Sequence, residues 1–179
     1  MDWVARNSTV SGLTSFVQFG DWLSPLPSKI VDEMSSAFNH AQAIRIARDT
    51  ATALGHPSAE SYSAAYSQAQ RGFHAAYYKN GTYGNGEQAA LVYALYLGSA
   101  PAHISAAVLE QLIHSIQGDP RCRPCLATGI LSTKWIMETL SLHGRTDVAL
   151  SLALKTASPS WGHMVQAGAT TISESWMSV

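Results

Sequence analysis

Apolar residues recur every three or four positions along most of the chain, which is the spacing of one buried helix face. The first long run follows Ser28, which is expected to cap the helix, and ends at Gly55 with a proline two places on. A second run extends from Ser58 to Tyr77 and stops at the turn sequence Lys79-Asn-Gly81. These runs predict two helices joined by a short turn, which is a helical hairpin.

The same alternation of helix and turn continues towards the end of the chain. Further helices are predicted over residues 89–97, between Pro101 and Gly118, from 126–129 onward past Trp135, and over 147–155. Strands are expected only as short pieces near residues 16–19, 126–128 and 169–172. The pattern therefore predicts an all-α fold built from helical hairpins.

The composition is that of one globular domain and disfavours several kinds of partner. Of the 179 residues, 46% are hydrophobic and 13% are charged, which is enough apolar surface for a core. The net charge of −1 comes without a basic stripe, so no nucleic acid is expected as a partner. No apolar run approaches the roughly 20 residues that span a bilayer, so no membrane association is expected. The first residues lack a secretory signal pattern, which leaves the cytoplasm as the default compartment.

The two cysteines, Cys122 and Cys125, form one Cys-x-x-Cys pair. A zinc site needs four ligands, and the seven histidines are scattered, so neither a metal nor a cofactor is predicted. We expect two ordinary loop thiols in a reducing compartment, with a local disulfide as the alternative.

Two segments carry candidate chemistry. Glu174 is the only acidic residue after Asp147, and it lies among tryptophans, glycines and threonines, a setting typical of a sugar site. Near the other end, Gly20 and the following prolines hold Asp21 and Trp22 on a loop, where ligands are commonly bound. The alternative for the Glu174 segment is that its tryptophans anchor the core and that Glu174 caps a helix or lies in solvent. For Asp21 and Trp22 the alternative is that they cap a helix and fill the core.

Five motifs occur along the chain in a recognisable order. They are Phe19-Gly-Asp-Trp-Leu23, Ser36-Ala-Phe38, Gly86-Glu-Gln-Ala, Leu126-Ala-Thr-Gly129 with its continuation to Thr133, and Pro159-Ser-Trp-Gly-His-Met followed by Gly168-Ala-Thr-Thr-Ile-Ser-Glu-Ser-Trp176. Together they resemble the bacterial-type α-L-rhamnosidases, inverting glycoside hydrolases whose catalytic domain is an (α/α)6 toroid. The resemblance covers nearly the whole chain.

The resemblance implies that residues 1–179 are an incomplete six-hairpin catalytic domain, corresponding to the later part of the toroid. The family's amino-terminal half, which carries the general acid, and its carboxy-terminal β-sandwich are expected to lie outside these residues. In such a toroid the longer loops gather at one end, which is expected to bring Asp21, Glu87 and Glu174 near one another.

The resemblance also implies roles for individual residues. Glu174 corresponds to the general base that activates water, and Asp21 and Trp22 correspond to a hydroxyl acceptor and an aromatic wall for the rhamnose ring. The other expected substrate-binding residues are Trp161, His163 and Trp176. Where the family commonly has Trp and Arg beside the base, this chain has Ser173 and Ser175.

Three functions are compatible with these residues. The first is a rhamnosidase-like glycosidase that hydrolyses terminal α-L-rhamnosides with inversion and acts weakly or not at all alone, because it lacks the acid. The second is a noncatalytic carbohydrate-binding protein derived from that fold. The third is a helical interaction protein that covers the open toroid edge by forming a homo-oligomer. For the first two, the expected partner is a rhamnose-containing glycoside.

Overall fold

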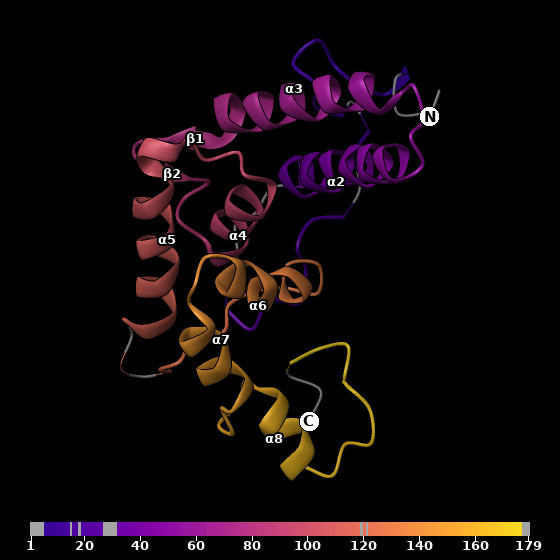
Figure 1. Cartoon of the computed structure of the whole chain (residues 1–179). Coiled ribbons are helices and arrows are strands. Elements are labelled where there is room, and N and C mark those ends of the chain that lie inside the picture. Colours follow the sequence, from indigo (N-terminus) through magenta and orange to yellow (C-terminus); the bar gives the residue numbers. More distant parts are fainter. Residues whose placement is uncertain are drawn as a thin grey trace.

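The computed structural model describes residues 6–14, 16–17, 19–26, 32–118, 120 and 122–176. Within these residues the chain forms seven helices and one small hairpin of strands (Figure 1). They are α2 (Asp32–Ala53), α3 (Ala59–Tyr77), β1 (Tyr78–Lys79), β2 (Thr82–Tyr83), α4 (Gln88–Leu97), α5 (Ala102–Gln117), α6 (Thr133–Leu142), α7 (Thr146–Ala153) and α8 (Trp161–Gln166). The predicted all-α class and the order of the helical hairpins are confirmed.

Helices α2 and α3 form the first hairpin and run side by side (Figure 1). Gly55 ends α2 with a φ of 60°, a left-handed value that glycine adopts without steric cost. The predicted N-cap at Ser28 lies outside the described residues. The bounds of α3 match its predicted run, because its apolar positions keep the helical period throughout.

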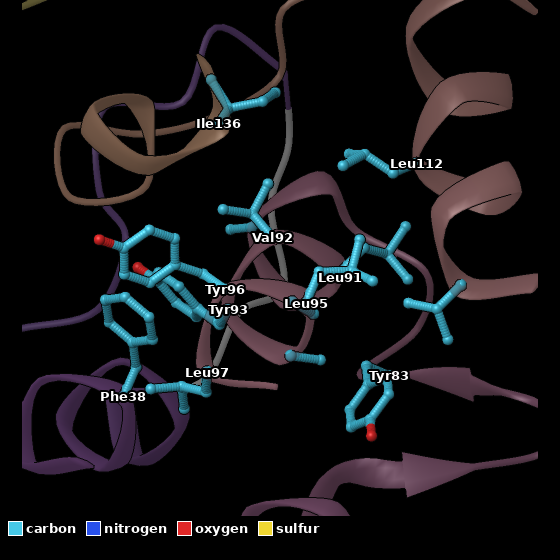
Figure 2. Packing of buried hydrophobic residues seen from close by; sticks show 14 of the residues in the cluster. Phe38, Tyr83, Leu91, Val92, Tyr93, Leu95, Tyr96, Leu97, Leu112 and Ile136 are labelled. Atoms are coloured by element: carbon cyan, nitrogen blue, oxygen red, sulfur yellow. The ribbon is translucent and has the colours of Figure 1, made fainter. Parts of the chain in front are cut away.

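Helix α4 forms the centre of the core. All ten of its residues are buried, and Leu91, Val92 and Tyr93 have no exposed surface. A helix that is apolar on every side has to be covered on every side, and side chains from α2, α5, α6 and the β hairpin surround it (Figure 2). The ring of Phe38 on α2 stacks on Tyr93 with centroids 4.2 Å apart. The short apolar run at residues 89–97 is therefore a fully buried helix.

Two predictions about the irregular segments are wrong, and one short helix was not predicted. The helix expected to open at residues 126–129 begins at Thr133, and the residues before it form an extended loop. The described residues near 16–19, 126–128 and 169–172 form no strand, since none of them belongs to a sheet. The strands in the described part are β1 and β2, which pair Tyr78 with Tyr83. A short helix, α8, was not predicted; the Ser160 hydroxyl caps it by accepting a hydrogen bond from the His163 backbone N–H at 2.9 Å.

The prediction of free thiols is also wrong, because Cys122 and Cys125 form a disulfide. Their Cα atoms are 4.9 Å apart, within the range that a disulfide spans. The backbone N–H of Cys125 donates to the carbonyl of Ile116 at 2.7 Å, and the Lys155 ammonium donates to the carbonyl of Cys122 at 3.1 Å. The disulfide loop is thus tied both to α5 and to the segment after α7.

In the described part of the chain, no helix combines the length and apolarity needed to cross a bilayer.

Candidate functional site

Asp21 is buried, and its carboxylate is used by the protein itself. It accepts hydrogen bonds from the backbone N–H groups of Gly129 (2.8 Å), Leu131 (3.0 Å) and Ser132 (2.9 Å), and a fourth from the Ser132 hydroxyl. These N–H groups lie directly before α6, at the end of the helix that favours a negative charge. Four bonds fill the acceptor sites of a carboxylate. The structure thus supports the helix-capping alternative for Asp21 and leaves no lone pair for a sugar hydroxyl.

The backbones on either side of this contact lie directly against each other. The Ile130 N–H donates to the carbonyl of Trp22 at 2.9 Å. A Cβ atom on Gly129 would lie 2.3 Å from that same carbonyl oxygen, closer than any side chain tolerates. Glycine is therefore required at position 129, and it allows the Trp22 loop to rest on the segment before α6.

Trp22 remains half exposed, with 51% of its surface accessible, and stacks on Phe19 with centroids 5.7 Å apart. The two rings form one wall of a pocket of about 710 Å³. Its lining consists of Thr14, Phe16, Phe19, Gly20, Trp22, Ser36, Asn39, His40, Ala43, Ile130 and Leu131. Aromatic surface beside a few polar groups is the usual make-up of a small-ligand site. We call this hollow the Trp22 pocket.

The polar groups of the Trp22 pocket come from α2. Ser36, Asn39 and His40 are spaced i, i+3 and i+4, so they share one helix face. The Nε2 atom of His40 lies 3.0 Å from the Ser8 hydroxyl, and burial lowers the pKa of His40. Sequence reasoning did not identify Asn39 and His40 as site residues. The available signal was that these polar residues are spaced like the buried apolar residues of the same helix, such as Ala37 and Ala41.

At the other end of the chain, Trp176 is an anchor. Only 7% of it is exposed, its indole N–H donates to the carbonyl of Thr128 at 3.2 Å, and its ring meets that of Trp161 edge to face at 5.3 Å. Glu174 lies two residues earlier and is exposed. The buried indole therefore holds the loop that presents this carboxylate.

Trp161 and His163 belong to α8 and are half-buried. Trp161 lines a second hollow of about 510 Å³, whose walls are mostly apolar. The other residues of this hollow are Met164, Val165, Ala169, Thr170, Thr171 and Ile172. The hollow is thus formed by α8 and the loop that leads to Glu174.

Residues 125–133, which we call the joining segment, connect the loops of the candidate site. Besides Asp21 and Trp176, the segment binds the amide of Gln88, which donates to the carbonyl of Cys125 at 2.8 Å and accepts from the N–H of Ala127 at 2.8 Å. The neighbouring Glu87 instead accepts from Asn85 within its own turn. The loops of Asp21, Gln88 and Trp176 therefore meet on one stretch of backbone.

Among the residues that the structure describes, no three His, Cys, Asp or Glu side chains come together as a possible metal site. The candidate chemistry therefore consists of an exposed carboxylate, an aromatic pocket and the segment that joins their loops.

Comparison with known proteins places the chain in a family. The family described as the bacterial alpha-L-rhamnosidase 6 hairpin glycosidase domain matches residues 1–179. The α-L-rhamnosidase of Streptomyces avermitilis is 30% identical over 162 residues, which cover 90% of this chain and 15% of that protein. Those of an Alteromonas species and Formosa agariphila are 29% and 28% identical and cover 94% and 98% of this chain. The chain spans 19% and 20% of their lengths.

Solved structures show the same relationship. The Streptomyces avermitilis α-L-rhamnosidase complexed with L-rhamnose superimposes with a TM-score of 0.86 at 27% identity, covering 99% of this chain and 17% of that one. The enzymes from Dictyoglumus thermophilum and Aspergillus terreus each give a TM-score of 0.87 at 26% identity. Both alignments cover 99% of this chain, and 21% and 22% of theirs. The chain belongs to the bacterial α-L-rhamnosidase six-hairpin glycosidase family.

Proposed function

We propose that this chain carries the water-activating part of an α-L-rhamnosidase site and acts in the hydrolysis of terminal α-L-rhamnosides with inversion. The observation that supports this most directly is the bond from Trp176 to Thr128. It holds the Glu174 loop on the joining segment, and Asp21 holds the Trp22 loop on the same segment. The loop of the Glu174 carboxylate and the loop of the Trp22 pocket are thereby both fixed to the joining segment.

In this proposal Glu174 is the general base. Inverting hydrolysis needs a base that takes a proton from water while the water oxygen attacks the anomeric carbon, on the face opposite the leaving oxygen. The glycosidic bond breaks as the new C–O bond forms, and an acid roughly 6.5–9.5 Å from the base protonates the leaving oxygen. Glu174 is exposed, so it has room for the attacking water.

We assign no general acid within this chain, which bears on the activity expected of it. Acid assistance typically contributes about 10²- to 10⁴-fold in rate. The serines at 173 and 175 also remove the aromatic and cationic neighbours that commonly flank the family's base. The chain alone is therefore expected to hydrolyse natural rhamnosides weakly or not at all, whereas an aryl rhamnoside with a good leaving group depends less on the acid.

The Trp22 pocket is the proposed rhamnose site. The face of Trp22 suits the apolar side of a pyranose ring and its methyl group, and Ser36, Asn39 and His40 offer hydrogen bonds to the hydroxyls. Trp161 and His163, on α8, are proposed to contact substrate from the side of the Glu174 loop. Trp176 is proposed to hold the Glu174 loop in position and not to contact the sugar itself, since its ring is buried.

Hydrolysis of p-nitrophenyl α-L-rhamnoside by the purified chain tests the proposal. Proton NMR should show β-L-rhamnose as the first product, and Glu174→Gln should lower the rate at least 100-fold, in line with the loss of a general base. Glu60→Gln is the matched control, because Glu60 is an exposed glutamate on α3. A Glu174→Gln variant that keeps the full rate, or α-L-rhamnose as the first product, would contradict the proposal.

A noncatalytic carbohydrate-binding protein is the second candidate. It is favoured by the exposed Trp22 wall, which forms a pocket without any contribution from Glu174. Saturable quenching of tryptophan fluorescence by L-rhamnose, with no hydrolysis by the unmodified chain or by Glu174→Gln, would support this candidate over the glycosidase.

The predicted homo-oligomer also remains a proposal. Leu142 on α6 and Leu150 and Leu154 at α7 are exposed, at 66%, 54% and 70%. Exposed leucines are the kind of side chain that a second copy could cover. Sedimentation that shows a monomer at every concentration would count against the oligomer.

A further inference from the structure

The β hairpin carries a sequence motif that the glycosidase chemistry does not use. Asn80-Gly-Thr82 matches Asn-x-Thr, the acceptor sequence for N-linked glycans. Asn80 and Gly81 form the two-residue turn between β1 and β2 and have positive φ values of 53° and 84°. Positive φ at both positions is the geometry of a type I′ turn, which Asn-Gly favours. The acceptor asparagine therefore lies at the tip of a tight hairpin.

The hairpin tip is open to solvent. Asn80 and Gly81 are exposed, and a Cβ atom placed on Gly81 would find no other atom within 4 Å. A glycan on the Asn80 amide would thus project away from the hairpin without displacing any neighbour. Nothing in the core depends on this side chain.

The disulfide is an independent observation that points to the same modification. Both cysteines of the chain are joined in the Cys122–Cys125 bond. Disulfides persist in oxidising compartments such as the lumen of the endoplasmic reticulum and the cell exterior. N-linked glycans are added in that lumen, so a disulfide and an exposed acceptor sequence in one chain are mutually consistent.

We propose that Asn80 is an N-glycosylation site and that the chain is made on the secretory route of a cell with this modification. The Nδ2 atom of Asn80 attacks the anomeric carbon of an oligosaccharide carried on a polyprenyl diphosphate. A C–N bond forms, the bond from the anomeric carbon to the diphosphate oxygen breaks, and the diphosphate leaves with the electron pair. The amide nitrogen gives up one proton to a base of the transferase.

The contacts of Thr82 indicate when this transfer takes place. In the folded chain the Thr82 hydroxyl donates to Oε1 of Gln111 at 2.7 Å, and the Gln111 amide donates to the carbonyl of Gly81 at 2.9 Å. Helix α5 thus holds the hydroxyl that the transferase must recognise. Because Gln111 is synthesised after Thr82, the acceptor is free until α5 docks, and transfer precedes that step.

A second Asn-x-Thr sequence, at Asn7, lies in a different environment. Asn7 is half-buried, and the next residue, Ser8, has its hydroxyl 3.0 Å from His40 of the Trp22 pocket. The Thr9 hydroxyl accepts from the N–H of Leu13 at 3.1 Å. A glycan on Asn7 would have to be accommodated in this packed segment once the chain folds, whereas the hairpin tip has open space for one, so we assign the site to the hairpin tip.

The test is to secrete the 179-residue chain from yeast behind a cleavable signal and to map its glycans. The secreted protein is denatured, treated with peptide N-glycosidase in ¹⁸O water and cleaved after glutamate, which yields a peptide of residues 61–87 that contains Asn80 but not Asn7. The expected result is an ¹⁸O-labelled aspartate at position 80. Asn80→Gln and Thr82→Ala should each lose the glycan mass, whereas Thr82→Ser should retain the label.

Two further variants separate the acceptor sequence from the fold around it. Asn85→Gln, in the next exposed turn, should leave the label at position 80 unchanged. Gln111→Ala frees the Thr82 hydroxyl and should leave the occupancy equal or raise it. Secreted chain with an intact disulfide and an unlabelled asparagine at position 80 would overturn the proposal. None of these outcomes depends on the proposed hydrolysis.

Discussion

The indole N–H of Trp176 donates a hydrogen bond to the carbonyl of Thr128, 48 positions earlier in the chain. The next residue, Gly129, donates its own N–H to Asp21 near the other end of the chain. Two loops that are far apart in sequence are thus fixed on adjacent residues of the joining segment. The positions of the Glu174 loop and of the Trp22 loop depend on these two contacts.

Trp176→Phe keeps the aromatic packing but removes the indole N–H. The buried carbonyl of Thr128 then keeps only the long hydrogen bond from the Thr133 hydroxyl at 3.4 Å, and the loss of the indole bond costs about 1–3 kcal/mol of unfolding free energy. Since the Glu174 loop loses its anchor, the turnover of p-nitrophenyl α-L-rhamnoside should fall more than the affinity for L-rhamnose. Urea unfolding measures the stability, fluorescence titration measures the affinity, and release of p-nitrophenolate measures the turnover. Equal losses of turnover and affinity would place Trp176 in the sugar site itself.

Asp21→Asn tests the capping role of Asp21. An amide offers fewer acceptor sites and turns an N–H group towards backbone donors, so we expect a loss of about 2–3 kcal/mol of unfolding free energy. Asp49→Asn is the control, because Asp49 is exposed and pairs only with the neighbouring Arg48 in the described structure. If Asp21→Asn kept full stability and only weakened rhamnose binding, Asp21 would be a substrate contact.

How far the sequence predicts the fold depends on where each contact comes from. The run from Ser58 to Tyr77 predicts α3 well, because its apolar period is local. The start of α6 could not be read locally, since the carboxylate that caps it belongs to Asp21, about a hundred positions away. The period of the sequence shows which residues are buried, but it does not show which distant side chain ends or begins a helix.

For the candidate site too, the sequence indicated some residues and not others. Trp22 and Glu174 lie in motifs that a reader can recognise, and both are exposed. The pocket wall formed by Asn39 and His40 was missed, because a polar helix face is equally typical of a solvent-exposed surface. The disulfide was missed because two cysteines at this spacing are compatible with either redox state, and only the fold of the 122–125 loop brings the sulfurs together.

Reduction of the Cys122–Cys125 bond should loosen the joining segment. The bond closes a loop with a sequence separation of 3, and the chain-entropy account gives about 2 kcal/mol for so short a loop. Thermal unfolding of the Cys122→Ser, Cys125→Ser double variant, compared with the oxidised chain, measures this contribution. A second scan in dithiothreitol serves as the control, since the reductant should destabilise the unmodified chain and leave the double variant unchanged. A double variant as stable as the oxidised chain would mean that the bond adds nothing to the fold.

His40 should make the stability fall in mild acid. Burial lowers its pKa in the folded chain, whereas the unfolded residue titrates near its ordinary value of about 6.5. Between these two values the unfolded state binds more protons, so the unfolding free energy decreases as the pH drops below about 6.5. His40→Gln should flatten this part of the profile, and His103→Gln, at an exposed position on α5, should not. An unchanged profile for His40→Gln would show that other groups cause the acid sensitivity.

The most direct test of the central claim is chemical rescue of a Glu174→Ala variant by azide. If Glu174 activates water, its removal leaves space on that face of the sugar, and azide attacks the anomeric carbon of p-nitrophenyl α-L-rhamnoside as p-nitrophenolate leaves. The account predicts that the variant recovers p-nitrophenolate release in azide and forms β-L-rhamnosyl azide, while the unmodified chain forms none. Turnover by Glu174→Ala equal to that of the unmodified chain, or an azide product with the α configuration, would contradict it.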